Sequence, residues 1–469
     1  MNSASPDPLT ASAVSEEPVL GQVLADAAVT FGLIASDTDR RTLVTDPSTG
    51  RPVAAVPVTL PADAERAAAW ARSVHPAWQG VGIRERLRCA ARLRSLLRAH
   101  SAALGPVLAH TCGLGPRDLR AEDRAAGAVL RRHTAAARAC FAGPGPYGRL
   151  WPGARPARRG RGAGAAPVVT AWGDPSRPLA SLLEGALPAL LAGSTVITRA
   201  APRLAPAGAH MLLLAQAAGL PPGTWQLAVS APPHTTGLEA ALAAHTDRTA
   251  PQCCTPPPHG PAAPRTLAPG LCVVRHDARP RAAAPTAALT CFARAGRMCT
   301  ATPVLVVHAS LYEGFLQHFL RAAAHDYLAD DVAVPAEAER LELLAWLDGA
   351  IADGARLLHP GLAQDATGRG PFVLGVPSPD HVRPGELPTG PLAVVTRYTS
   401  WSQVQSLARR TGGHTTVFTR TPPARLRPLL PSPPTRHLHL NTVPRPGLPP
   451  LTALRAITAA PDPGGEAAR

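Results

Sequence analysis

Cys299 is the residue of this chain best placed for covalent chemistry. It follows an Ala/Gly-rich stretch and stands just before 303–308, an apolar, β-branched run that predicts a buried strand. Gly296 lets the backbone come close to whatever binds beside the sulfur, and a cysteine thiolate is a strong nucleophile. The segment therefore predicts covalent catalysis at Cys299. The alternative is a small buried hydrophobic side chain, the commonest fate of a free cysteine.

The other cysteines predict neither a disulfide framework nor a metal site. The eight show no CxxC pair and no regular spacing, so no metal ligand is expected. They are Cys89, Cys112, Cys140, Cys253, Cys254, Cys272, Cys291 and Cys299.

The elements that must position Cys299 begin with alternating strands and helices. Strands are predicted at 166–171, 194–198 and 225–229, with helices at 179–191 and 206–219 between them. This βαβαβ order predicts a parallel, Rossmann-like sheet. Before it we expect a strand at 53–60 and helices at 64–74 and 84–100, with further helix through Ala137. The first helix is expected to end before the sequence His75-Pro76.

Beyond Cys299 the same alternation continues. His437 and His439 stand in a Pro-rich stretch, where single histidines are expected to be solvated. The prolines of 251–265 exclude a helix there. The further helices are expected at 311–328, 336–352 and 402–409, and the further strands at 392–398 and 415–419.

The composition describes a globular protein of two or three domains. The chain has 469 residues, 45% of them apolar and 4% aromatic. All 47 basic residues are arginine, and the formal net charge is +15. The arginines are scattered apart from a cluster in 155–161, and no nucleic-acid-binding motif accompanies them. We therefore expect a solvated basic surface and no nucleic-acid partner.

A reduced cytoplasm is expected, because neither a secretory signal nor a membrane span is predicted. The segment 1–17 is polar and acidic, unlike a secretory signal. No apolar run reaches the roughly 18 residues of a membrane span, so no membrane partner is expected.

Several segments together resemble the aldehyde dehydrogenase superfamily. Residues 295–301 resemble its Ala-Gly-Gln-x-Cys-Thr-Ala nucleophile segment, and 220–225 its Leu-Pro-Pro-Gly turn. The turn at 46–50 and the acidic segment 386–391 follow in the family order. The resemblance implies an α/β fold, with a Rossmann-type cofactor domain and an α/β catalytic domain. The implied division is a lead-in at 1–40, a cofactor domain at 41–266 with an oligomerisation hairpin at 143–166, a catalytic domain at 267–440 carrying Cys299, and a C-terminal segment at 441–469.

The resemblance also implies roles for particular residues. Cys299 takes the place of the nucleophile. The oxyanion-binding Asn of a Trp-Asn-Phe-Pro segment corresponds to Ser176, or to Gly173 if the register shifts by three residues. Ser176 is also expected to cap the following helix. The general-base Glu corresponds to Ala268, which cannot move a proton.

The cofactor implied is NAD or NADP. Arg199 replaces the lysine that meets the adenine ribose, and Pro202 replaces the glutamate three residues later. Ser194 and Glu386 are further candidate cofactor contacts. The helix that holds the pyrophosphate corresponds to a start at Thr255-Pro256, where no helix is expected.

The resemblance implies NAD(P)-dependent oxidation of an aldehyde to a carboxylic acid through a cysteine thiohemiacetal, weakened by the missing groups. One alternative is a catalytically degraded homologue that serves as a binding or accessory protein. Another is cysteine-dependent acyl transfer without hydride transfer. The expected partners are a small-molecule aldehyde and further copies of the chain in a homo-oligomer.

Overall fold

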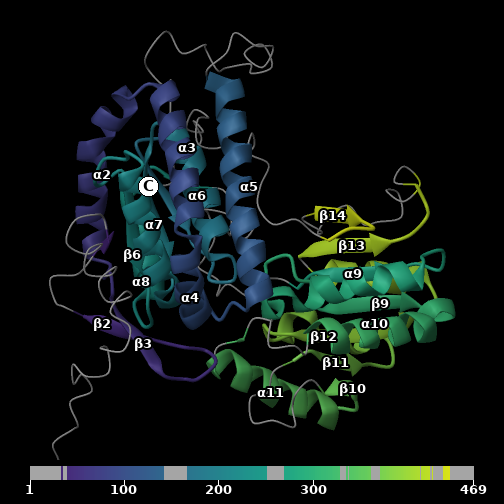
Figure 1. The fold of residues 1–469 in the computed structure, drawn as a ribbon. Coiled ribbons are helices and arrows are strands. Elements are labelled where there is room, and N and C mark those ends of the chain that lie inside the picture. The colour runs from purple at the N-terminus through teal and green to yellow at the C-terminus, as the bar shows by residue number, and fades with distance from the viewer. Residues whose placement is uncertain are drawn as a thin grey trace, which may run out of the picture. The chain divides into compact units, whose positions relative to one another are not determined.

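The computed structural model describes residues 33–34, 40–141, 166–250, 269–327, 334–335, 337–360, 370–411, 413–422, 425 and 437–443. They form two compact units, drawn in Figure 1. The first contains the described residues up to Cys112 and from Leu119 to Ala250. The second contains Gly113–Asp118 and the described residues from Pro269 onward.

The first unit is an α/β unit with a small separate hairpin. Its elements are β1 (Leu33–Ile34), β2 (Arg41–Thr45), β3 (Pro52–Pro57), α2 (Asp63–Gly80), α3 (Ile83–Ala99), α4 (Ser101–Cys112), most of α5 (Pro116–Phe141), β4 (Val168–Trp172), α6 (Pro178–Ala192), β5 (Thr195–Ala200), the 3₁₀ turn η3 (Pro202–Leu204), α7 (Ala205–Ala217), β6 (Trp225–Val229), α8 (Thr235–His245) and β7 (Arg248–Thr249).

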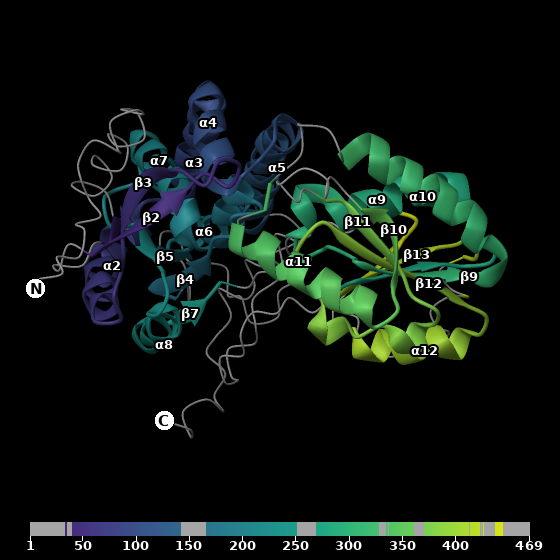
Figure 2. The ribbon, with the colours of Figure 1, turned by 90° about the horizontal axis from the view of Figure 1, so that it is seen from below.

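The main sheet of this unit has the strand order β1-β6-β5-β4-β7, and all its pairs are parallel. Helices α2 and α8 cover one face through side chains such as Ala68 and Leu242, and α6 and α7 cover the other (Figure 2). Because both faces are buried, β4 and β6 read as largely apolar runs. Gly193 ends α6 in the left-handed conformation, at φ 102°, and the chain turns there into β5.

Helix α2 corrects the prediction that the chain leaves the helix before Pro76. The helix runs through this proline to Gly80. A proline inside a helix removes one hydrogen bond and costs about 3 kcal/mol. Trp78 offsets this cost, because it is 2% exposed and its Nε1 donates to the Leu190 carbonyl at 3.1 Å.

The second unit is built on a seven-stranded sheet. Its elements are β8 (Leu271–Val274), α9 (Pro280–Phe292), η4 (Ala293–Gly296), β9 (Val304–His308), η5 (Ala309–Leu311), α10 (Tyr312–Tyr327), α11 (Glu337–Ala352), β10 (Arg356–Pro360), β11 (Phe372–Gly375), η6 (Pro379–His381), η7 (Pro384–Glu386), β12 (Leu392–Tyr398), α12 (Trp401–Arg410), β13 (His414–Phe418) and β14 (His437–Leu440).

The order of this sheet is β10-β11-β12-β9-β8-β13-β14, and β10 is the only one of these strands that runs antiparallel to its neighbour. Figure 2 shows α9 and α10 on one side and α11 and α12 on the other. Successive side chains of β9 point to opposite faces of the sheet and pack against the helices on each face. Leu305 and Val307 pack with α9 and α10, whereas Val304 and Val306 pack with α11 and α12.

Strand β14 corrects the expectation that His439 is merely solvated, while that for His437 stays a prediction. Its backbone extends the sheet beside β13. His439 is half-buried, and its Nε2 lies 2.9 Å from Nδ1 of the buried His414. Pairing with β13 therefore overrides the Pro-rich surroundings from which a loop was expected.

One parallel and one mostly parallel sheet, each covered by helices on both faces, confirm the predicted α/β class. Within the parts of the chain that the structure describes, no helix is both long and apolar enough to cross a membrane.

Candidate active site

Cys299 lies in the second unit, in the connection between η4 and β9. The residue is 9% exposed, and the neighbouring Thr300 and Thr302 are buried as well. The residue is therefore nearly buried, at the end of the sheet where β8 and β9 begin. The Gly270 N–H donates to the Ala301 carbonyl at 3.1 Å, which brings the start of β8 against the nucleophile segment.

A left-handed turn precedes the cysteine. Arg294, Ala295 and Gly296 have φ values of 56°, 54° and 65°. L-residues disfavour this region, and each non-glycine residue held there costs on the order of 1–3 kcal/mol. Only glycine fits at the third position, because a Cβ on Gly296 would collide with the Gly390 carbonyl. Strained backbone of this kind is common at active sites, where the surrounding structure holds it in place.

Polar contacts hold this turn. The Arg294 Nε lies 3.3 Å from the Asp118 Oδ1, and both side chains are largely buried. The Arg294 carbonyl accepts hydrogen bonds from the backbone N–H of Arg297 at 3.3 Å and from its Nε at 3.2 Å. The segment before Cys299 is thus tied to the start of α5 and to its own next turn.

Two other thiols in this unit are poor nucleophiles. Cys272 and Cys291 are fully buried in the core beneath α9 and α10. Burial raises the pKa of the Cys272 thiol, and burial together with the nearby Cys272 raises the pKa of the Cys291 thiol. The Cys291 Sγ donates to the Thr302 carbonyl at 3.1 Å. Both are structural side chains, so Cys299 is the better candidate of the three.

In the first unit, the segment expected to supply the oxyanion donor is a five-residue loop. Strand β4 ends at Trp172 and α6 begins at Pro178, so 173–177 lie between them, where a Trp-Asn-Phe-Pro segment has two residues. The strand end supports the register that selects Gly173, and the helix start supports the register that selects Ser176. An insertion of three residues accounts for both alternatives.

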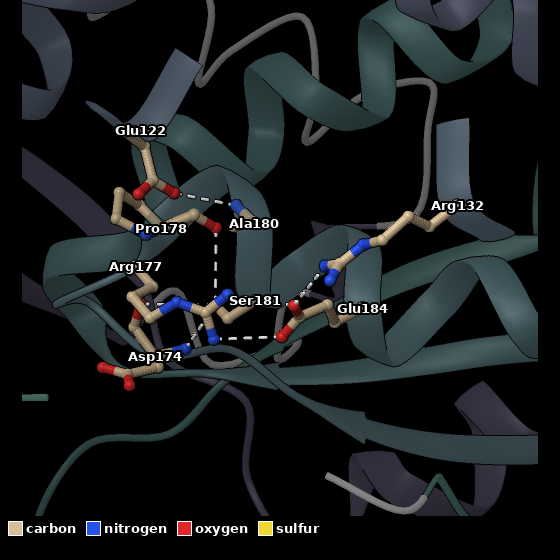
Figure 3. A network of polar contacts seen from close by, with 8 residues as sticks. All are labelled: Glu122, Arg132, Asp174, Arg177, Pro178, Ala180, Ser181 and Glu184. Atoms are coloured by element: carbon tan, nitrogen blue, oxygen red, sulfur yellow. Dashed lines mark hydrogen bonds and ion pairs between the residues drawn. The ribbon is translucent and has the colours of Figure 1, made fainter. Parts of the chain in front are cut away.

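Ser176 is 2% exposed, and its backbone N–H donates to the Asp174 Oδ1 at 2.8 Å. The prediction that Ser176 caps α6 is wrong, since the N-cap position is Arg177, which makes no side-chain capping bond. The cap comes from a distant helix, where the Glu122 Oε1 accepts the Ala180 N–H at 2.8 Å (Figure 3).

Buried charges fix the same loop. The Arg177 guanidinium forms two hydrogen bonds of 3.0 Å to the Glu184 carboxylate, and Arg132 reaches that carboxylate at 3.6 Å (Figure 3). The Ser181 hydroxyl accepts the Asp174 N–H at 2.8 Å. The loop is therefore held by ion pairs and turns built from its own side chains.

Arg199 lies near the carboxyl end of β5 with two neighbours that the sequence did not reveal. Its Nη2 is 2.7 Å from the Glu239 Oε1, and its guanidinium carbon lies 4.8 Å from the centre of the Trp172 ring. Glu239 belongs to α8, and Trp172 is the last residue of β4. A cation, a carboxylate and an aromatic face thus meet at the ends of two adjacent strands.

The remaining candidates lie in less suitable places. Ser194 has no exposed surface, so a contact with a bound molecule would require movement of the backbone around it. Glu386 is in η7 with its side chain exposed, 3.7 Å from the Arg383 guanidinium. Ala268, Thr255 and Pro256 lie outside the described residues, as does the hairpin at 143–166 except for its last residue.

Comparison with known proteins decides the family. The sequence profile of the aldehyde dehydrogenase family matches residues 33–249 and 270–425. The chain belongs to the aldehyde dehydrogenase family. The resemblance found in its motifs is thereby confirmed.

Individual aldehyde dehydrogenases are similar at low identity. A vanillin dehydrogenase from Amycolatopsis sp. is 25% identical over 390 residues, which cover 78% of this chain and 77% of that protein. The fold matches succinate-semialdehyde dehydrogenase from Burkholderia pseudomallei with a TM-score of 0.74 at 20% identity, covering 93% and 94% of the two chains. It also matches NADP-dependent glyceraldehyde-3-phosphate dehydrogenase from Bacillus halodurans C-125 complexed with NADP, with a TM-score of 0.74 at 16% identity, covering 91% and 97%.

The donor set at the ends of β4 and β5 fits the adenosine part of a dinucleotide. The Arg199 guanidinium and Glu239 carboxylate offer a donor and an acceptor for sugar hydroxyls. In open parallel sheets, ligands bind outside the carboxyl ends of the strands, where these side chains lie.

Sequence reasoning missed two carboxylates that meet arginines, Glu239 in the first unit and Asp118 in the second. Each meets its arginine through tertiary packing from a distant helix. The sequence carries no local signal for either pair, because the two partners lie far apart along the chain.

Proposed function

We propose that this protein is an NAD(P)-dependent aldehyde dehydrogenase that oxidises an aldehyde to a carboxylic acid through Cys299. The observation that carries the proposal is the strained left-handed turn that ends beside a nearly buried thiol, between α9 and β9. In this proposal the first unit holds the cofactor and the second carries the nucleophile. The family match supports the reaction class.

The chemistry assigned to the chain's own residues begins at sulfur. The Cys299 sulfur, as thiolate, adds to the aldehyde carbonyl carbon and gives a tetrahedral thiohemiacetal oxyanion. The backbone N–H of Cys299 is one donor for this oxygen. When bound, NAD(P) supplies the acceptor for the two electrons and the hydrogen that leave the substrate.

We propose that release of the product is the slow step. Hydrolysis requires a base that takes a proton from water, and the position that the family assigns to this base is Ala268. We therefore expect weakened turnover.

The proposal also includes a homo-oligomer. Light scattering of the purified chain tests this oligomeric state.

The deciding experiment follows reduced nucleotide after mixing the protein with NAD or NADP and a panel of aliphatic and aromatic aldehydes. We expect a burst of about one equivalent per active site, followed by slow turnover. Cys299→Ala should abolish both phases, while the control Cys140→Ala, which changes a half-exposed thiol of α5, should keep them. Ala268→Glu should speed only the slow phase.

Three outcomes count against this account. If no aldehyde gives reduced nucleotide, the dehydrogenase is rejected and the degraded, accessory homologue becomes the better description. If the slow phase accelerates with added coenzyme A but not in Ala268→Glu, release occurs by acyl transfer to a thiol. If Cys299→Ala retains the burst, the nucleophile is misassigned.

A further inference from the structure

The first unit has the topology that places the ribose of a dinucleotide at the end of β5. The consecutive strands β4, β5 and β6 lie in the order β6-β5-β4, and β7 continues on the far side of β4. This is the strand order of a mononucleotide-binding half, in which the residue at the carboxyl end of the second strand meets the adenine ribose. The second strand here is β5, and Arg199 is its penultimate residue.

At that position the charge of Arg199 is already matched. Its guanidinium lies 2.7 Å from the Glu239 carboxylate, with exposed side-chain fractions of 11% and 24%. The pair is only partly hydrated, so the interaction between its charges is stronger than at an open surface. The Trp172 ring holds the other side of the guanidinium at 4.8 Å.

This arrangement distinguishes the two nucleotides. A ribose 2′-hydroxyl can donate a hydrogen bond to the Glu239 carboxylate, whereas a 2′-phosphate would bring further negative charge against it. An unopposed arginine at this place would instead favour the phosphate. The carboxylate comes from α8, and Pro202, just after β5, offers no acidic group.

We propose that Glu239 is a specificity-determining residue that makes this protein select NAD over NADP. The statement rests on the proposed function, since it requires that the first unit binds a dinucleotide. Glu239 acts on the nucleotide and through Arg199, whose orientation it fixes.

Isothermal titration calorimetry with NAD and NADP, and with ADP-ribose and its 2′-phosphate, tests this on the full chain. We expect the wild type to bind each unphosphorylated nucleotide at least tenfold more tightly than its 2′-phosphate counterpart. Glu239→Gln should narrow or reverse this ratio by tenfold or more, mainly through tighter binding of the phosphates. The control Glu85→Gln, which changes an exposed ion-paired glutamate of α3, should leave the ratio unchanged.

The outcomes separate the inference from the proposed function. The inference is overturned if the wild type prefers NADP, or if Glu239→Gln does not change the ratio of the affinities for the unphosphorylated and 2′-phosphorylated nucleotides. In either case the proposed dehydrogenase function is unaffected. Binding by Glu239→Gln alone would mean that the pair closes the site, which also overturns the inference. Binding by no variant overturns both. A melting curve of each variant shows whether it is folded.

Discussion

At the scale of single residues, Asp118 holds the left-handed turn 294–296 that precedes Cys299. Arg294 holds a left-handed φ of 56° with its guanidinium 7% exposed and 3.3 Å from the Asp118 carboxylate, itself 13% exposed. Removing one partner of a buried pair leaves the other charge uncompensated, which costs on the order of 3 kcal/mol. The Asp118 carboxylate is therefore a positioning group for the segment that carries Cys299.

Asp118→Asn should lower both stability and thiol reactivity. We expect a loss of about 3 kcal/mol in the free energy of unfolding of the second unit. We also expect a several-fold slower alkylation of Cys299 by iodoacetamide at pH values where the fold persists. Asp123→Asn, on the same helix, is the matched control and should leave alkylation unchanged. Equal alkylation rates in the two variants would remove Asp118 from this role.

At the scale of an element, the η4 turn is constrained by the backbone packed against Gly296. A Cβ on Gly296 would meet the Gly390 carbonyl, a backbone atom that cannot swing aside as a flexible side chain would. The connection between α9 and β9 therefore has one geometry, set by the segment that leads into β12. The packing of this connection against the segment that leads into β12 fixes the position of Cys299 more than the sequence of the connection does.

Gly296→Ala should disrupt the site by moving this connection. We expect a loss of several kcal/mol in stability, because φ 65° and the collision both oppose the methyl group. The burst of reduced nucleotide should disappear. Gly314→Ala is the matched control, since Gly314 lies in α10 with open space around it, and alanine there should stabilise the helix by up to about 1 kcal/mol. Full activity of Gly296→Ala would contradict the geometry of η4.

Elements with a clear apolar pattern or a distinct end signal were predictable from sequence. Strand β6 has the predicted bounds, and the α6–β5 turn was identifiable from Gly193. Helix α9 was missed because it is Ala-rich, carries Pro285 and lacks a clear polar face. Of the candidate site residues, Cys299 was predictable because it stands in a recognisable segment. The partners of Arg199 and Arg294 were not, because they come from distant parts of the chain.

Acid sensitivity belongs to the scale of the whole molecule. His133, on α5, is 2% exposed, and burial, with a smaller contribution from Arg132, lowers its pKa from 6.5 to about 4. Burial also lowers the pKa of His75 and of His210. Neutral histidines stabilise the native state fully above pH 6.5, and this contribution is lost as the pH falls, because the unfolded chain takes up protons that the native protein does not.

Denaturant unfolding between pH 7 and pH 4 checks this expectation. His133 alone should account for about 3 kcal/mol lost across that range, with the loss complete near pH 4. His133→Gln should flatten the pH profile, whereas His381→Gln, at an exposed histidine of η6, should not. A wild-type stability that is constant from pH 7 to pH 5 would contradict the account.

The order of strands in the second unit has a consequence for its synthesis. Strand β8 emerges from the ribosome first but lies inside the sheet, between β9 and β13. Its second neighbour begins only at His414, and the edge strand beyond it only at His437. Such pairings between distant segments form slowly, and until then the apolar edge of β8 stays open to other chains. The yield of correctly folded protein should therefore depend on translation speed and on chaperones that cover this strand.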